Sequence, residues 1–176
     1  GDEPADFHAN DPRLQRSVRV GLHTDVYAIF GRRDKMGRMI RVANPPRIDQ
    51  VFVAALNMYA PHPDPQHLNP KTTFLLRAAY EGTYLAALWR GSRILYLTLV
   101  GGGSFGNPPE MIADAIAEAH AHWISHPASK HLERVILPIY PQGDHGIASL
   151  IVNALHKHGI PNEVIEVVRF IDGEQV

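Results

Sequence analysis

Cysteine is missing altogether from this sequence of 176 residues. Disulfide bonds and thiolate catalysis are therefore excluded, but the compartment is not, because cytosolic and secreted chains can both lack cysteine. Long apolar runs are missing as well: no stretch approaches the roughly 20 residues that a membrane-spanning helix needs, and no basic-then-apolar leader is visible. We therefore expect a cytoplasmic protein that does not work in a membrane.

An excess of either charge is also absent. Seventeen lysines and arginines stand against 18 aspartates and glutamates, a net charge of −1 at pH 7. Binding to the phosphate backbone of nucleic acids is driven by an excess of positive charge, and so is binding to anionic membrane surfaces. The overall balance gives neither role any support, so we expect neither nucleic acid nor membrane among the partners.

The composition that remains is typical of one globular domain. Hydrophobic residues make up 45% of the chain, which is enough for a single core at this length. Residues 1–16 are polar, contain Pro4 and Pro12, and show little periodicity, so we expect a flexible tail or linker there. The domain itself is expected over residues 17–176.

Hydrophobic periodicity predicts strands first and then an alternation of helices and strands. Residues 17–30 alternate like a half-buried strand, a charged turn at 31–37 leads back to a strand at 39–42, and residues 50–59 are typical of a strand buried on both faces. A helix is expected from Asn69 and Pro70 to Gly91. Further strands are expected at 93–100, 134–139 and 164–171, with a helix at 146–158, which predicts a mainly parallel α/β sheet.

The strongest chemical signal is a glycine-rich loop between the 93–100 strand and the next helix. The loop consists of Gly101, Gly102, Gly103, Ser104, Phe105, Gly106 and Asn107. We expect Asn107 to cap that helix, with Pro108 at its first position and Glu110 placed for a capping box. Glycines allow backbone N–H groups to converge on an anion, and the helix N-terminus adds positive partial charge, so such a loop suits a phosphate. A tight turn with no ligand is the alternative.

Two common nucleotide motifs do not fit this loop. No lysine follows its last glycine, as a Walker A loop would require, and the G-x-G-x-x-G spacing with a later acidic residue is absent. Ordinary P-loop and Rossmann folds are therefore poor matches.

Residues 75–155 resemble the second half of macro domains. The resemblance rests on a helix that carries Tyr80, a buried strand, and a loop of the form Gly-x-Tyr/Phe-Gly-x-Pro, here Gly103 to Pro108. The Gly-Gly-Gly-Ser-Phe-Gly-Asn version of the loop, the segment from Ala79 to Thr83 and the His23-Thr24-Asp25-Val26 stretch are similar to a divergent branch that contains ADP-ribosylhydrolases of bacterial effectors.

The resemblance implies a three-layer α/β/α fold and a site for ADP-ribose or an ADP-ribosylated protein, with no cofactor. Residues 101–106 would cradle the diphosphate, Phe105 would pack on the distal ribose, and Tyr140 would lie beside the adenine. Both hydrolysis of an ADP-ribosyl linkage and binding without turnover fit the resemblance. It also implies that a secreted effector is an alternative to a cytoplasmic protein.

One part of the macro pattern is missing. Macro domains carry an early Asn-Ala-Ala-Asn-type segment with its own glycine-rich loop, and Asn57 in Ala-Leu-Asn-Met is not that motif. We therefore expect a mostly parallel or mixed sheet that is incomplete in this chain, with the first half supplied by a complementary polypeptide or an upstream segment. The alternative is a domain that dispenses with that half.

His23 and Asp25 are the candidate catalytic groups. Their i, i+2 spacing places both on one face of a strand, where Asp25 could activate a water that His23 orients. The alternative is that this face is solvated, which is ordinary for polar residues of half-buried strands.

The remaining polar residues suggest two other chemistries. The Gly-Gly-Ser-Phe-Gly segment also fits G-x-S-x-G, so Ser104 could be a nucleophile with Asp144 and His145 as acid and base. The adjacency of those two residues and the short chain argue against an α/β-hydrolase. His122 and His126 stand four apart but lack an evident third ligand, so we expect no metal.

Overall fold

The computed structural model describes residues 12–61, 68–139, 146–161, 165–171 and 174–175. Its hydrophobic core lies entirely in the second part of the chain. No residue described between 17 and 71 is buried, whereas the buried residues run from Thr72 to Ile165. The body of the molecule is therefore built from residues 72–165, and the preceding strands attach to its outside.

The principal sheet has four strands in the order β5 (Ile94–Tyr96), β6 (Arg134–Ile139), β7 (Ile165–Ile171) and β8 (Glu174–Gln175). The β5–β6 and β6–β7 pairs are parallel, and β8 returns antiparallel to β7. Helices α3 (Pro109–Ile124) and α4 (Ile147–Lys157) make the two crossovers, and a 3-10 turn, η2 (Pro127–His131), precedes β6. The predicted alternation of strands and helices and the parallel pairing are confirmed. The two follow from each other, because parallel neighbouring strands need a crossover connection, which the helices supply here.

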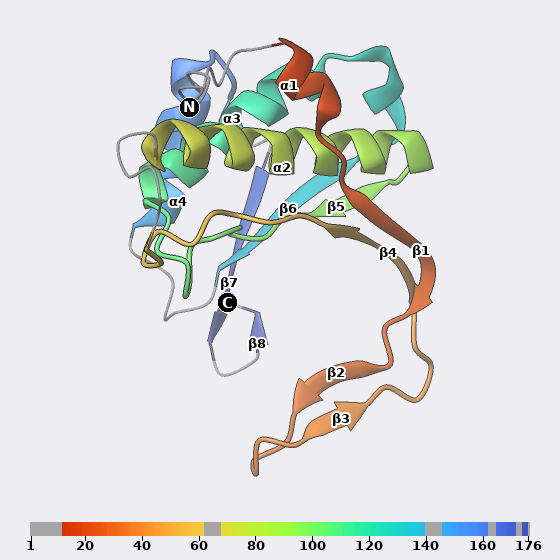
Figure 1. The fold of residues 1–176 in the computed structure, drawn as a ribbon. Helices are drawn as coiled ribbons and strands as arrows, with labels where there is room; N and C mark the ends of the chain where they lie inside the picture. Colours follow the sequence, from red (N-terminus) through yellow and green to blue (C-terminus); the bar gives the residue numbers. More distant parts are fainter. Residues whose placement is uncertain (1–11, 62–67, 140–145, 162–164, 172–173, 176) are drawn as a thin grey trace.

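The helices pack side by side, α2 (Leu68–Arg90) on α3 and α3 on α4 (Figure 1). The buried stripe of α2 recurs at helical spacing, and the helix stops at Gly91, whose φ of 63° ends it in the left-handed conformation. One polar pair is buried between α2 and α3, where the Tyr84 hydroxyl lies 2.7 Å from His120 Nδ1. Burial lowers the pKa of His120 to about 4, so this ring is neutral at pH 7. None of the described helices is long and apolar enough to cross a bilayer.

The strands before α2 form two separate antiparallel ribbons. A short helix, α1 (Pro12–Ser17), stands where the end of a flexible tail was expected, while residues 1–11 lie outside the described residues. β1 (Gly21–Tyr27) pairs with β4 (Arg47–Phe52), and β2 (Phe30–Arg33) pairs with β3 (Met39–Arg41). In Figure 1 the β2–β3 hairpin projects away from the body.

Two expectations about these strands were wrong. The strand expected at 17–30 is divided at Ala28 and Ile29, so its first part pairs with β4 and only its end joins the hairpin. The strand expected at 50–59 ends at Phe52 and is not buried on both faces. The continuous apolar sequence predicted one long strand. Residues 53–59 instead leave the ribbon and pack beside the glycine-rich loop.

Among the described residues, no strand pairing joins the β1–β4 ribbon to the principal sheet. Within this part of the chain β4 pairs only with β1, and β5 is an edge strand of its sheet, so each presents an open edge. The prediction of an α/β fold with a mixed sheet that is incomplete in this chain is confirmed.

Candidate functional site: the glycine-rich loop

The glycine-rich loop follows directly from β5. That strand is shorter than the expected 93–100, although Leu97 stays buried and its N–H still donates to the Ile136 carbonyl at 2.8 Å. The chain then turns at Val100 and does not become helical until Pro109. The loop therefore leaves the carboxyl end of a parallel strand and enters a helix N-terminus, as predicted.

Tyr80 forms hydrogen bonds with the backbone at the start of the loop. This buried α2 residue donates its hydroxyl to the Thr98 carbonyl at 2.8 Å and accepts the Val100 N–H at 3.1 Å. Burial raises the pKa of Tyr80, so the hydroxyl keeps its proton and can serve both bonds. Tyr80 thus positions the loop on the helix layer, a role that the sequence did not reveal.

Asn107 does not cap α3, contrary to expectation. The helix begins at Pro109 with Pro108 as its cap residue and no side-chain cap. Asn107 is instead buried inside the loop, where its Nδ2 donates to the Leu56 carbonyl at 2.7 Å and to the Phe105 carbonyl at 3.2 Å. Two consecutive prolines shift the helix start, and the asparagine closes the loop on itself and on the 55–59 segment.

Two of the loop glycines are required by the fold. Gly101 has a φ of 77°, and a Cβ there would come within 2.7 Å of Ala55 Cβ and of Asn107 Oδ1. Gly106 has a φ of 63°, and a Cβ there would come within 2.4 Å of the Tyr59 ring. Larger residues are disfavoured at both positions by conformation and by contact. These glycines therefore shape the loop whether or not a ligand binds.

Gly103 lies differently. It has no positive φ, and a Cβ built there would meet nothing within 4 Å. Gly102 is intermediate, since its Cβ would lie 3.2 Å from Ile112 Cδ1. The tip of the loop at Gly103 thus faces open space, and no structural requirement explains a glycine at this position.

The loop tip presents three free backbone donors. The amides of Gly102, Gly106 and Asn107 are bonded to carbonyls within the loop region. In contrast, the consecutive amides of Gly103, Ser104 and Phe105 have no acceptor among the described residues, and all three residues are exposed. Consecutive free N–H groups in front of a helix N-terminus are an arrangement suited to an anion.

The 55–59 segment forms the outer wall of the loop. The Met58 N–H donates to the Phe105 carbonyl at 2.8 Å, and the Tyr59 ring lies against Gly106. Tyr59 is 77% exposed and Phe105 is 41% exposed, so two aromatic rings flank the free amides with much of their surface in solvent. The sequence does not indicate Tyr59 as a site residue. The close approach of an aromatic ring to a loop glycine is a tertiary contact that has no signal in the sequence.

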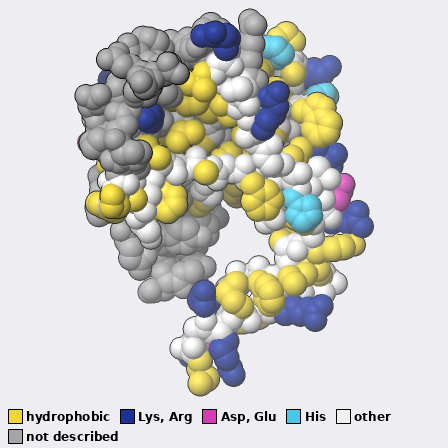
Figure 2. Space-filling view, in the orientation of Figure 1, with side chains coloured by type: hydrophobic (Ala, Val, Ile, Leu, Met, Phe, Trp, Pro, Cys, Tyr) yellow, Lys and Arg dark blue, Asp and Glu magenta, His cyan; other side chains and the backbone are white. Residues whose placement is uncertain are grey.

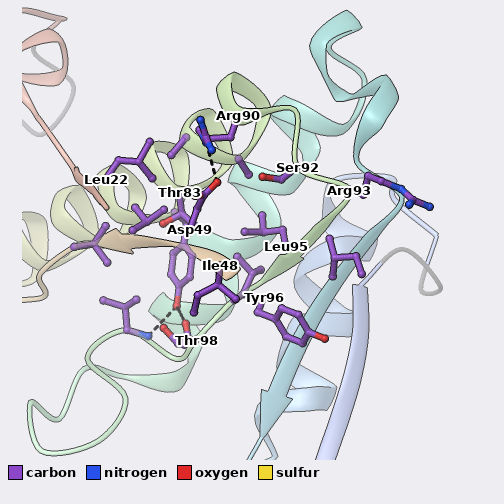
Figure 3. Close-up of a pocket in the computed structure, with 18 of the residues that line it drawn as sticks. Leu22, Ile48, Asp49, Thr83, Arg90, Ser92, Arg93, Leu95, Tyr96 and Thr98 are labelled. Atoms are coloured by element: carbon purple, nitrogen blue, oxygen red, sulfur yellow. Dashed lines mark hydrogen bonds and ion pairs between the residues drawn. The ribbon is translucent and has the colours of Figure 1, made fainter. Parts of the chain in front are cut away.

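A cavity of about 640 Å³ runs from the loop toward the far end of α2 (Figure 3). It lies between the open edge of β4 and the open edge of β5, with α2 on one side. Its lining is mainly apolar and includes Ile48, Val51, Ile94, Leu95, Tyr96 and Val100. Figure 3 shows Asp49 and Arg90 at one end and Thr98 at the other.

His23 and Asp25 lie away from the loop. The β1–β4 register shifts between His23 and Val26, and Asp25 has a φ of 57°, so the simple alternation that would place both side chains on one face does not hold. His23 stacks on Phe52 at a centroid distance of 6.4 Å. The Asp25 N–H donates to Asp49 Oδ1 at 2.8 Å.

The contacts of Asp25 show how far it is from the loop. Its carboxylate lies 3.4 Å from the Arg90 guanidinium, which also donates to Asp49 at 2.8 Å and lowers the pKa of Asp49. Arg90 is ten residues beyond Tyr80 on α2, or about 15 Å along the helix axis. Tyr80 is the residue that touches the loop. The structure therefore does not bring the two candidate catalytic residues to the glycines, and their catalytic role stays a prediction.

The other residues considered from the sequence fall partly inside and partly outside the described ranges. Tyr140, Asp144 and His145 lie outside the described residues. Ser104 is exposed at the loop tip. His122 lies 3.0 Å from Glu81, and no group of three or more potential metal ligands occurs in the part of the chain that the structure describes.

Comparison with solved structures finds a similar fold in poly(ADP-ribose) glycohydrolase from Deinococcus radiodurans. Its complex with ADP-ribose matches with a TM-score of 0.56 and 22% identity over 78% of this chain and 52% of that chain. A second crystal form of that complex gives 0.55 and 21% over 78% and 52%, and the apo form gives 0.53 and 19% over 81% and 55%. The chain thus spans about half the length of the structures it matches. No family model and no curated protein matches the sequence. At this level of identity the comparison shows the fold alone, and the predicted macro-like fold is confirmed.

Proposed function

We propose that this chain binds ADP-ribose or a close relative, with the diphosphate on the backbone amides of the loop at residues 101–107. The observation that carries the proposal is that three consecutive exposed residues, Gly103, Ser104 and Phe105, have amides with no acceptor among the described residues. Unpaired amides are costly when buried but are useful donors when they face a ligand.

The electrostatics of the loop favour an anion even though no lysine or arginine belongs to it. The loop runs into the N-terminus of the 16-residue helix α3, whose dipole adds positive partial charge. Open space in front of Gly103 allows a phosphate to approach the backbone closely. The matched glycohydrolase structures were solved in complex with ADP-ribose, which supports the same ligand class for this chain.

The flanking aromatic rings suit the other parts of this ligand. Phe105 and Tyr59 are aromatic residues with exposed surface at the loop, where a ribose or an adenine could pack. Tyr140 remains our predicted adenine neighbour, and Tyr59 is now a second candidate for a stacking contact. An ADP-ribosylated protein would present the same ADP-ribose group.

We further propose that the chain hydrolyses an ADP-ribosyl linkage, with binding without turnover as the alternative. Hydrolysis needs a carboxylate or another base within hydrogen-bond reach of the reacting water. Asp25 and His23 remain the candidates named from the sequence, but their contacts at the Arg90 end of α2 favour a structural role. The free amides account for binding, so the reader alternative needs no further group.

A complementary strand is the third part of the proposal. The cavity beside the loop is bordered by two strands, β4 and β5, that each have one unpaired edge. A further strand from polypeptide outside residues 1–176 would pair with both edges and cover the apolar lining. The chain spans about half of the matched structures, so those chains contain further polypeptide beyond the matched region.

Isothermal titration with ADP-ribose tests the proposed function. Gly103→Val fills the open space where the diphosphate would lie without a steric or conformational conflict in the fold, so we expect binding at least about tenfold weaker and an unchanged melting temperature. The matched control is Ser125→Val at the other end of α3, which should bind like the unmodified chain. Adenosine, which lacks the diphosphate, should bind much more weakly than ADP-ribose. Equal affinity of the Gly103→Val variant would rule out the loop as the phosphate site.

A further inference from the structure

The β2–β3 hairpin and its flanks concentrate the positive charge of the chain. Residues 27–47 contain six basic residues and one acidic residue, Asp34, a net charge of +5. The whole chain carries −1, which leaves −6 on everything outside this segment. The small net charge of the whole chain therefore results from a basic segment and an acidic remainder. The expectation that nucleic acid is not a partner was based on the net charge of the whole chain alone.

Most of these cations are available to a ligand. Asp34 is paired with Arg38 at 2.8 Å, and this contact lowers its pKa. Arg33 donates to the Gly37 carbonyl at 2.7 Å and keeps its charge unopposed. Lys35 and Arg41 are exposed and form no ion pair with any described residue. Within the described part of the hairpin, one carboxylate is therefore opposed to several free positive charges.

Apolar side chains alternate with the cations along the same arm. Tyr27 is 56% exposed, Phe30 54% and Met36 77%. Arg47 lies over the Tyr27 ring at 5.0 Å and donates to its hydroxyl at 3.0 Å, which braces that ring at the base of the hairpin. Figure 2 shows hydrophobic and basic side chains side by side along the projecting arm. No described residue of this segment is buried, so these side chains do not serve the core.

We propose that the β2–β3 hairpin is a binding site for single-stranded nucleic acid, separate from the glycine-rich loop. Phosphates would be neutralised by Arg33, Lys35 and Arg41, and unpaired bases would stack on Phe30 and Tyr27. Proteins that bind single strands combine a basic track with exposed aromatic rings in this manner. A bilayer would be met by the tip of the hairpin, whereas here the cations and rings extend from its base at Arg47 to its tip at Lys35, which fits an extended strand.

Fluorescence anisotropy with a labelled 20-nucleotide single-stranded DNA tests the proposal on the full chain between about 50 and 200 mM salt. For single strands, each phosphate contact adds about 0.7 to the steepness with which log K falls as log salt rises. Charge reversal by Lys35→Glu with Arg41→Glu should therefore reduce the slope by about 1.4 and weaken binding at least tenfold. Phe30→Ala should weaken binding about fivefold or more through lost stacking and leave the slope unchanged.

The control places the same charge change elsewhere. Lys130→Glu with Lys157→Glu, on η2 and α4, should leave the slope unchanged, and saturating ADP-ribose should not displace the DNA.

The proposal is overturned if the chain does not bind at 50 mM salt, or if the two charge-reversal variants behave alike. Displacement by ADP-ribose would move nucleic acid to the loop and would equally overturn it. Equal affinity for double-stranded DNA or for phosphatidylserine vesicles would show that bases are not recognised. Loss of ADP-ribose binding alone leaves these results unaffected, so the two proposals fail separately.

Discussion

Asp25 occupies a backbone conformation that few residues other than glycine adopt. Its φ is 57°, and its neighbours are a carboxylate that accepts its N–H and an arginine that pairs with its side chain. Aspartate and asparagine are the residues that tolerate this region best. The local contacts therefore explain a polar residue at this position without catalysis.

Asp25→Asn separates a structural role from a catalytic one. Asparagine keeps the backbone conformation and removes the charge opposite Arg90. Because this ion pair is partly exposed to solvent, we expect only a small fall in melting temperature, with single-turnover release of ADP-ribose unchanged. Asp49→Asn should lower the melting temperature more, since Asp49 binds both Arg90 and the Asp25 N–H. A hundredfold fall in release for Asp25→Asn would instead establish the general-base role.

The loop glycines show where prediction from sequence ends at this scale. The sequence does not distinguish Gly101, Gly103 and Gly106 from one another, and it predicts only that the loop suits a phosphate. Only the structure distinguishes them: two have positive φ and tight neighbours, and one faces open space. Two of the neighbours, Ala55 and Tyr59, lie more than 45 positions away in the sequence, and contacts over that separation have no local signature.

At the scale of elements, the helices and central strands were predicted well because their patterns are local. β6 occupies residues 134–139 as expected, and α2 and α4 end beside Gly91 and Gly159, both with positive φ. The strands before α2 were predicted poorly. The register shift in β1 and the departure of residues 53–59 depend on partners distant in sequence, and alternation cannot reveal either. The start of α3 was missed by one residue because Asn107 is held by Leu56 rather than by its own helix.

The whole molecule is distinguished by the open edges of β4 and β5. The unpaired edges of both strands face the same apolar cavity, whereas strand edges in complete sheets are normally short, covered or protected by charge. Leu97 bonds to β6, and alternate residues of a strand direct their backbone groups to opposite sides, so the amides of Ile94 and Tyr96 face the cavity.

Hydrogen exchange tests whether this edge is open. In the chain alone, the amides of Ile94 and Tyr96 should exchange at least about tenfold faster than that of Leu97, because only the latter is bonded within the sheet. Intact-mass analysis of the purified protein should then show whether a second polypeptide accompanies the chain and slows exchange at both positions. Slow exchange at Ile94 and Tyr96 in the chain alone would mean that the sheet is already closed, and would contradict the proposed complementary strand.

The central claim is that the three free amides of the loop tip bind the diphosphate of ADP-ribose. Titration of the isotopically labelled chain with ADP-ribose, followed by the amide resonances of Gly103, Ser104 and Phe105, measures this contact directly. We expect these three resonances to move downfield and saturate together, because each N–H gains a charged acceptor, while amides of the β2–β3 hairpin stay unchanged. Saturable binding that leaves the three resonances in place would contradict the account and locate the ligand elsewhere.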